Sequence, residues 1–441
     1  MQRPFDDDIR DALGADLAPD VPVMRTGEAE LLSCFAVTDL AEASISAAGQ
    51  ELAALTDARD ITVDRRLASM WFDRSLRPTS WALPSVWDPI AGDYPTADGW
   101  VRLHTNAPHH RDAALEVLGC AAEKESVAEV VAGWEKTALE QAVVGAGGAA
   151  AAMRAMDAWA RHPQGQAVAA EPLIAWEETG QSVGAAQLEG LRVLDLTRVL
   201  AGPVATRFLA GFGADVLRID PPWWSEPGVE PEVTVGKRRA GLDLTQSEDR
   251  AVFETLLAQA DVLVHGYRPG ALAGLGFDAE RLQTLAPGMI NVSLCAYGWA
   301  GPWANRRGFD SLVQMSCGIA AEGMQRKASE RPVPLPVQAL DHATGYLMAA
   351  AVLRAVRRRA QTGAVFSARL SLARTAQLLT SLGARDFEGA GIKESDQDLA
   401  ASEEQTSWGP AQRLQFPLLM EGAEPRWRYP AGHLRIDPAR W

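Results

Sequence analysis

The sequence contains few cysteines, and they are widely separated. Only Cys34, Cys120, Cys295 and Cys317 occur in 441 residues, and no two form a Cys-x-x-Cys pair. This spacing is unlike that of a disulfide-stabilised secreted domain or a cysteine-rich zinc site. We therefore expect free thiols in a reducing compartment, which favours the cytoplasm.

The sequence also lacks an excess of positive charge and a long apolar run. Its formal net charge of −15 argues against nucleic acid or an anionic membrane as a partner. The most apolar stretch, residues 142–153, is shorter than the roughly 20 residues that span a bilayer. The start carries Asp6, Asp7, Asp8 and Asp11 rather than the basic start of a secretory signal. We predict no nucleic-acid and no membrane partner.

Several common catalytic motifs are missing. No Gly-x-Gly-x-x-Gly run follows a predicted strand, and Gly236-Lys237 lacks the spacing of a P-loop. His104, His109 and His110 lie close in sequence, but no carboxylate stands at ligand spacing beside them. We expect His109 and His110 in a solvated loop and no metal site.

From residue 188 onward, predicted strands alternate with predicted helices. Such alternation is typical of a parallel sheet with helices on both faces, so we predict an α/β fold with a Rossmann-like domain. A long helix is expected from about Asp341 to Arg359, with its arginines at the C-terminal end. The predicted strands are residues 192–196, 215–219, 242–244, 261–264, 290–294 and 366–372.

The rest of the chain predicts two further parts. Residues 1–185 read as a smaller α/β domain in which residues 1–90 are hard to place, with a strand near 98–103 and helices at 111–118, 126–142 and 149–159. Residues 186–395 form the Rossmann-like domain, and residues 396–441 are predicted to be an irregular C-terminal arm.

Basic residues follow several of the predicted strands. Ligands of open parallel sheets bind beyond the carboxyl ends of the strands, so these side chains could hold a phosphate group. A solvated surface is an equally good interpretation for each of them. The residues are Arg218, Lys237, Arg238, Arg239 and Arg268.

Asp341 stands at the predicted start of the long helix. A carboxylate at a helix N-terminus is stabilised by the helix dipole and by free backbone N–H groups, so it stays ionised. An ionised carboxylate can act as a nucleophile. Local features alone favour a simpler role, that of capping the helix.

Five blocks of sequence resemble the class III (CaiB/BaiF-type) CoA-transferases, the family that includes formyl-CoA transferase and α-methylacyl-CoA racemase. The first block is LEGLRVLDLTRVLAGPVATRFLAGFGADVLRID, at residues 188–220. GKRRAGLDL (236–244), ADVLVHGYRPGALAGLGF (260–277) and AYGWAGPWANRRGFDSLVQ (296–314) follow in the family's order. LDHATGYLMAAAVLRAVRRRAQTG (340–363) completes the set, which extends over about 190 residues.

The resemblance implies a CoA-binding Rossmann-like domain, a smaller α/β domain and an interlocked homodimer. It implies acyl-CoA and a carboxylic acid acceptor as substrates, without a tightly bound cofactor. In the family, an aspartate at the position of Asp341 attacks the acyl carbon, and a mixed aspartyl anhydride forms. This chain departs from the family in its domain order, because the segment that resembles the small domain comes first.

The resemblance also implies a set of CoA-binding positions. The family's nucleotide and pantetheine contacts fall on Arg198, Val199, Leu200, Ala201, Leu242, Gly266, Tyr267, Arg268, Leu275, Arg307 and Phe309. Pro221 and Gly274 stand where family members carry an arginine, and Arg218 or Arg268 could compensate for that loss. Trp223, Trp224, Trp299 and Trp303 could shape an apolar acyl pocket.

Two other functions stay open. Racemisation needs a second proton-transferring group, and the racemases of the family place a histidine where this chain has Phe309. That difference favours CoA transfer over racemisation or isomerisation. The third possibility is a degenerate, non-catalytic member that binds CoA.

Overall fold

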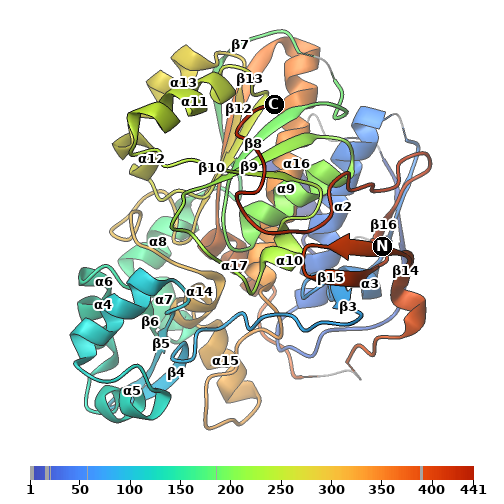
Figure 1. Ribbon diagram of the computed structural model, residues 1–441. Coiled ribbons are helices and arrows are strands. Elements are labelled where there is room, and N and C mark those ends of the chain that lie inside the picture. The colour runs from blue at the N-terminus through green and yellow to red at the C-terminus, as the bar shows by residue number, and fades with distance from the viewer. Residues whose placement is uncertain (1–3, 15–18, 20, 57, 185, 388–390) are drawn as a thin grey trace.

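A seven-stranded sheet forms the centre of the computed structural model, which describes residues 4–14, 19, 21–56, 58–184, 186–387 and 391–441 (Figure 1). The strand order is β10-β9-β8-β11-β12-β13-β7, and all neighbours are parallel except β13 and β7. The strands are β7 (Ala175–Gln181), β8 (Arg192–Leu196), β9 (Asp215–Asp220), β10 (Arg238–Gly241), β11 (Val262–His265), β12 (Ile290–Cys295) and β13 (Ala364–Ser371).

Helices cover both faces of this sheet, as the alternation in the sequence predicts. Alternate strand residues face opposite sides, so Val193 and Val264 pack against one helical layer and Leu194 and Leu263 against the other. The first layer contains α9 (Ala201–Gly211) and α16 (Ala339–Thr362). The second contains α11 (Ser247–Leu257), α12 (Ala271–Gly274) and α13 (Ala279–Leu285).

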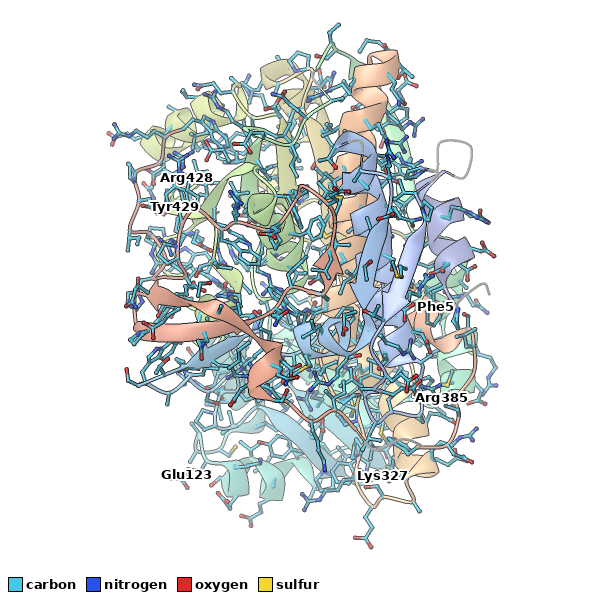
Figure 2. All side chains as sticks on the ribbon, turned by 90° about the vertical axis from the view of Figure 1, so that its right-hand side faces the viewer. Phe5, Glu123, Lys327, Arg385, Arg428 and Tyr429 are labelled. Atoms are coloured by element: carbon cyan, nitrogen blue, oxygen red, sulfur yellow. The ribbon has the colours of Figure 1, made fainter. Side chains whose placement is uncertain are left out.

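The long helix α16 lies at the centre of the molecule. Nearly all of its first 18 residues are buried, and small residues such as Ala349, Ala350 and Ala351 let its neighbours approach closely. At Gly345 a Cβ atom would lie only 2.4 Å from the carbonyl oxygen of Ala201, so α9 can approach α16 only at a glycine. The other neighbour of α16 is α2 (Val37–Thr56), which lies alongside it in both views (Figures 1 and 2).

A separate small α/β unit lies below the sheet in Figure 1. Its antiparallel strands are β4 (Gly92–Thr96), β5 (Gly99–Leu103) and β6 (Ala150–Ala152). Its helices are α4 (Pro108–Leu118), α5 (Lys124–Val131), α6 (Lys136–Gly145), α7 (Met156–Arg161) and α8 (Pro163–Ala170). The unit has a core of its own around Tyr94, Val101 and Leu139. It contacts the rest of the molecule through α14 (Asp310–Ser316), which packs against α16 and is followed by α15 (Ile319–Arg326).

The N-terminal residues and the C-terminal residues form sheets together. They contribute α1 (Asp6–Leu13), β1 (Val23–Thr26), β2 (Ile61–Asp64), α3 (Arg65–Trp71) and β3 (Leu76–Pro78) from one end, and β14 (Leu399–Thr406), β15 (Gly409–Leu414) and β16 (Leu418–Leu419) from the other. Strand β16 pairs with β2, and β15 pairs with β3. The remaining elements are α10 (Glu230–Val233), α17 (Leu372–Thr380) and a 3₁₀ turn, Asp396–Asp398.

Most predicted elements of the sheet are confirmed to within three residues. Residues 396–441, predicted to be an irregular arm, contain β14, β15 and β16, and three further predictions are wrong. The strand predicted at 242–244 lies earlier, at β10, the single helix at 126–142 is two helices, and residues 150–152 form a strand where a helix was expected. Alanine-rich residues favour helices, but β6 completes a sheet with β5, and this tertiary pairing outweighs the local preference.

The division of the chain also differs from the prediction. The elements before β4 do not join the small unit, because β1, α2 and β2 lie against α16 and the C-terminal strands. Strand β7 belongs to the large sheet although it precedes the expected boundary at 185/186, and Ala185 itself lies outside the described residues. In the described part of the chain, no helix is both long and apolar enough to cross a bilayer.

Candidate active site at the carboxyl end of the sheet

A cavity of about 430 Å³ lies beyond the carboxyl ends of β8, β11 and β12. Leu196 ends β8, Gly266 follows β11, and Cys295 ends β12, and all three line the cavity. The strand order reverses at β8. From β8 the chain proceeds to β9 and β10 on one side, and it then returns to β11 on the other side of β8. Open parallel sheets bind ligands at such a switch point. We call this cavity the main pocket.

Asp341 lines the main pocket from the first turn of α16. The helix begins at Ala339, two residues earlier than predicted, which makes Asp341 its third residue. The residue is 8% exposed, and no described residue donates a hydrogen bond to its carboxylate or pairs with it as a cation. The simple capping role is therefore not seen, because no side chain caps this helix.

Burial and a neighbouring carboxylate raise the pKa of Asp341 well above its ordinary value. The neighbour is Asp310, whose Oδ2 accepts the backbone N–H of Asp341 at 2.9 Å. Burial also raises the pKa of Asp310, to about 6. The prediction that the helix end keeps Asp341 ionised is thus incomplete, because desolvation and like charge oppose the helix dipole. An unpaired carboxylate of raised pKa is a better nucleophile than one held by a cation.

The loop after β8 holds a strained residue that lines the main pocket. Val199 has φ = 64°, a left-handed conformation that β-branched residues rarely adopt and that costs about 1–3 kcal/mol. Its N–H donates to Oε2 of Glu226 at 2.8 Å, which fixes the loop in this shape. The backbone of this loop is therefore held close to the pocket at an energetic cost.

Three arginines line the main pocket without a carboxylate partner. Arg198 lies over the rings of Trp224 and Tyr267, at 4.8 and 5.5 Å, while Arg268 and Arg307 donate only to carbonyl oxygens. None of the three forms an ion pair within the described ranges. Burial and the charge of Arg268 lower the pKa of Arg307. Cations that repel one another around a cavity favour binding of an anion.

Most of the residues predicted to bind CoA lie around this one pocket. Those that line it are Arg198, Val199, Ala201, Gly266, Tyr267, Arg268, Leu275, Arg307 and Phe309. Leu200 and Leu242 do not line it, because Leu200 packs into the core beside α9 and Leu242 into the layer under α11. Trp223 and Trp224 line the pocket, whereas Trp299 and Trp303 do not.

Four of the five basic residues proposed for phosphate binding do not line the main pocket and form ion pairs with carboxylates instead. Arg218 is fully buried and pairs with Asp220 and Glu226, and Lys237 is buried against Asp195. The other two, Arg238 and Arg239, pair with Asp215 and Asp437. Arg218 therefore cannot replace the arginines missing at Pro221 and Gly274, whereas Arg268 faces the pocket.

Two histidines expected in a solvated loop lie in a helix and line the main pocket; His109 is exposed as expected, whereas His110 is buried. His109 and His110 belong to α4, whose start brings the small unit against the large sheet. His110 is 4% exposed, and neither of its ring nitrogens has a hydrogen-bond partner among the described residues. Burial lowers the pKa of His110 to about 3, so its imidazole is neutral at pH 7. No spacing in the sequence links His110 to Asp341, because tertiary packing alone brings them to one cavity.

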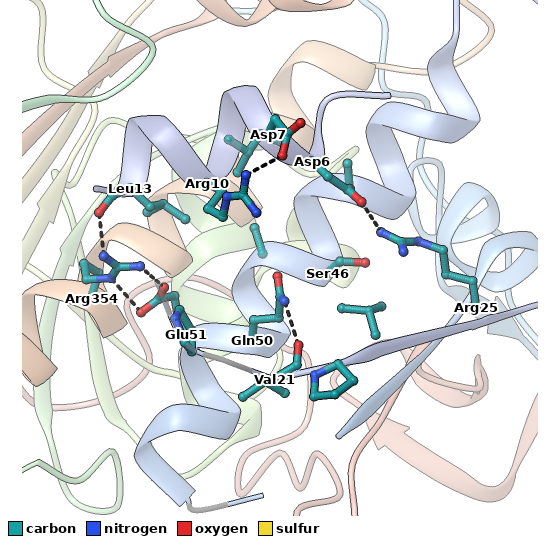
Figure 3. A pocket seen from close by; sticks show the side chains of 16 residues that line it. Asp6, Asp7, Arg10, Leu13, Val21, Arg25, Ser46, Gln50, Glu51 and Arg354 are labelled. Carbon is teal, nitrogen blue, oxygen red and sulfur yellow. Dashed lines mark hydrogen bonds and ion pairs between the residues drawn. The ribbon is translucent and has the colours of Figure 1, made fainter. Parts of the chain in front are cut away.

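A second cavity, of about 390 Å³, lies among α1, α2, β1 and α16 (Figure 3). Its charged side chains bind one another: Arg354 pairs with Glu51, Arg25 with Asp6 and Arg10 with Asp7. This neutral, internally paired lining differs from the unpaired arginines of the main pocket. Within the described ranges, no three His, Cys, Asp or Glu side chains come together to hold a metal ion.

Residues 188–402 match the family model described as CoA-transferase family III. This match makes residues 188–402, which we call the family III segment, similar to that family. Asp341 and the three unpaired arginines all fall inside the family III segment, while His109 and His110 fall outside it.

The family III segment is also similar to curated proteins. The acetyl-coenzyme A transferase nodX of Hypoxylon pulicicidum is 35% identical over 190 residues, which cover 42% of this chain and 32% of that protein. The succinyl-CoA:glutarate CoA-transferase of Mus musculus is 33% identical over 189 residues, 40% of this chain and 43% of that protein. The chain thus matches less than half of the length of each of these relatives.

A solved structure of a CAIB/BAIF family protein from Brucella suis aligns with 52% of this chain and 65% of its own, at 25% sequence identity. The TM-score of that alignment is 0.39.

Proposed function

We propose that this protein transfers CoA from an acyl-CoA thioester to a carboxylic acid, with Asp341 as the nucleophile. One observation carries the proposal: a buried carboxylate without a cation lies in the same pocket as three arginines without carboxylates. The family III segment supplies both features. The names of its relatives, which include an acetyl-CoA transferase, agree with this chemistry.

The proposed reaction proceeds in successive steps at Asp341. One of its carboxylate oxygens attacks the thioester carbon, the carbon–sulfur bond breaks, and CoA leaves as a thiolate. The acceptor carboxylate then attacks the Asp341 carbonyl carbon of the mixed anhydride and displaces the donor's acyl group as a free carboxylate. The CoA thiolate attacks the acceptor's acyl carbon, which forms the new thioester and releases the Asp341 carboxylate. A covalent intermediate of this kind divides one difficult transfer into easier steps.

The arginines of the main pocket suit the phosphate groups of CoA. Charge-assisted hydrogen bonds to a phosphate are worth about 1.5–3 kcal/mol each, and Arg268 and Arg307 have guanidinium N–H groups to spare. Arg198, which lies between Trp223, Trp224 and Tyr267, extends this basic rim. An anionic ligand would relieve the mutual repulsion of Arg268 and Arg307.

Trapping of the intermediate tests the proposal directly. An acyl-CoA is mixed with the protein and hydroxylamine, and the mass of the peptide that contains Asp341 is measured. We expect a hydroxamate at Asp341 that is absent in Asp341→Ala. Unmodified Asp341 together with full transfer activity in Asp341→Ala would overturn the proposal. Thermal stabilisation by CoA without any turnover would indicate a binding protein instead.

A second candidate is proton exchange at the carbon next to the thioester carbonyl. His110 favours it, because a neutral imidazole without a hydrogen-bond partner lines the same pocket as Asp341. Such a pair could remove and return a proton from opposite sides. Incubation of an acyl-CoA in deuterated water without an acceptor acid distinguishes the two functions, because only exchange incorporates deuterium. Deuterium incorporation that is lost in His110→Phe would support this candidate over transfer.

A further inference from the structure

Trp223 lies at the outer end of the main pocket with most of its indole ring in water. It lines the pocket and is 64% exposed, whereas Asp341, which lines the same pocket, is 8% exposed. An apolar ring that stays in water contributes little to folding, because only buried apolar surface stabilises the fold. An exposed aromatic side chain at the mouth of a cavity is instead typical of a binding site.

A tight turn holds Trp223 in this position. The N–H of Trp224 donates to the carbonyl oxygen of Pro221 at 3.0 Å and closes the turn. Pro222 occupies the second position of the turn, where proline fixes the backbone, and Trp223 occupies the third. Arg435 donates to the carbonyl oxygen of Trp224 at 2.6 Å and ties the turn to the C-terminal residues. A constrained backbone therefore presents the indole to the pocket, which reduces the entropy lost when a ligand binds.

The neighbours of Trp223 leave a face of its indole open. Arg198, which has no carboxylate partner, lies over the ring at 5.6 Å. The rings of His109 and Trp224 approach it at steep angles, 88° and 77°, so no described aromatic ring stacks face to face on Trp223. The open face can accept a flat ring, and the adjacent guanidinium favours a ligand that also carries negative charge. A nucleotide combines both properties.

We propose that the adenine ring of the CoA substrate stacks on the indole of Trp223. The inference rests on the proposed function and names the residue that recognises the nucleotide end of the donor. Attack by Asp341 places the thioester carbon at the buried end of the pocket, and the nucleotide is the opposite end of CoA, so the base belongs at the exposed end. An acyl group bound at Asp341 would lie away from Trp223. Thioesters of CoA are therefore better donors than the same acyl groups on pantetheine without a nucleotide.

Binding of CoA and of its nucleotide half tests the inference without relying on turnover. Isothermal titration calorimetry measures the Kd of CoA and of adenosine bisphosphate, which keeps the base and lacks pantetheine. Trp223→Leu removes the flat ring and keeps an apolar side chain, so both Kd values should rise at least about fivefold, the smallest effect typical of a lost base–aromatic stack. Trp223→Phe keeps an aromatic face and should stay within about twofold of the unaltered protein.

Trp81→Leu is the matched control. Trp81 stacks on Trp408 at 5.9 Å and does not line the main pocket, so both Kd values should stay within about twofold. An equal rise in Trp81→Leu and Trp223→Leu would overturn the inference, because the effect would then be general.

Three other results would also overturn the inference. Adenosine bisphosphate could fail to bind to the unaltered protein, or it could bind equally well to Trp223→Leu. Equal weakening in Trp223→Leu and Trp223→Phe would show that the flat ring is not what binds the base. Transfer from acetyl-CoA is measured in parallel on the unaltered protein. Absence of transfer, together with a weaker Kd in Trp223→Leu, would contradict the proposed function and leave the stacking residue in place.

Discussion

Two regions of this protein share the same order of strands and helices, and each has an aspartate at the start of the first helix. The two aspartates differ in their charged partners. In one region β12 and β13 are parallel neighbours, α16 leads into β13, and α17 follows it at once. In the other, β1 and β2 are parallel neighbours joined by α2, and α3 follows at once. Asp341 is the third residue of α16, and Asp39 is the third residue of α2. The two helices pack against each other (Figure 2).

The difference lies in the residue that follows each second strand. Arg65, the first residue of α3, donates to Asp39 at 2.7 Å and to Glu42 at 2.9 Å. The corresponding first residue of α17 is Leu372, which lines the main pocket with Asp341 and brings no charge. A buried carboxylate that pairs with a cation has a structural role, whereas a buried carboxylate without a cation can react with a substrate.

The largest expected effect is the difference in transfer activity between variants of the two aspartates. Asp341→Ala should reduce CoA transfer by at least about 1,000-fold, because it removes the proposed nucleophile. Asp39→Ala should leave kcat within a few-fold, since its carboxylate is bound to Arg65 outside the pocket. Steady-state kinetics on both variants measures the contrast. An equal loss in the two would contradict it.

A second variant tests the structural role of the Asp39 region. Arg65→Met leaves the carboxylates of Asp39 and Glu42 buried with fewer partners, so stability should fall by about 3–5 kcal/mol. The shift of the urea unfolding midpoint measures this loss. Arg281→Met, which breaks an exposed pair with Glu254, is the matched control and should cost less than about 1 kcal/mol. Equal shifts would show that Arg65 has no special role.

A third variant converts one region into the other. Leu372→Arg places a guanidinium where α3 has Arg65, so it should pair with Asp341 and lower transfer activity by about 100-fold. Leu372→Met keeps an apolar side chain of similar volume and should retain most of the activity. A Leu372→Arg protein that is folded and fully active would show that the missing cation is irrelevant.

The smallest effect concerns pH. Asp341 must be ionised to attack, so activity should rise with pH through its raised pKa. Asp310→Asn removes the neighbouring negative charge, lowers the pKa of Asp341 and should move the acidic limb of the profile to lower pH. Profiles of kcat/KM against pH for the two proteins measure the shift. Asp39→Asn should leave the limb unchanged, and a limb that does not move in Asp310→Asn would exclude this coupling.

Much of the fold followed from local patterns in the sequence. Apolar runs at 192–196, 262–265 and 290–295 marked buried strands, and the ordered motifs around them indicated the family. Prediction failed where partners distant in the chain decide the structure, as at β6, which pairs with β5, and at β16, which pairs with β2. The expected cytoplasmic location and homodimer stay predictions.

The sequence by itself determined the parallel sheet, the long helix and the position of Asp341 at its start, because periodicity and chain order report on neighbours along the chain. Only the tertiary structure decided the charge balance around that residue. It paired Arg218 and Lys237 away from the pocket, left Arg268 and Arg307 unpaired, and brought His110 from the small unit to the site. The physical reason is that a pKa and an ion pair depend on which side chains meet in space.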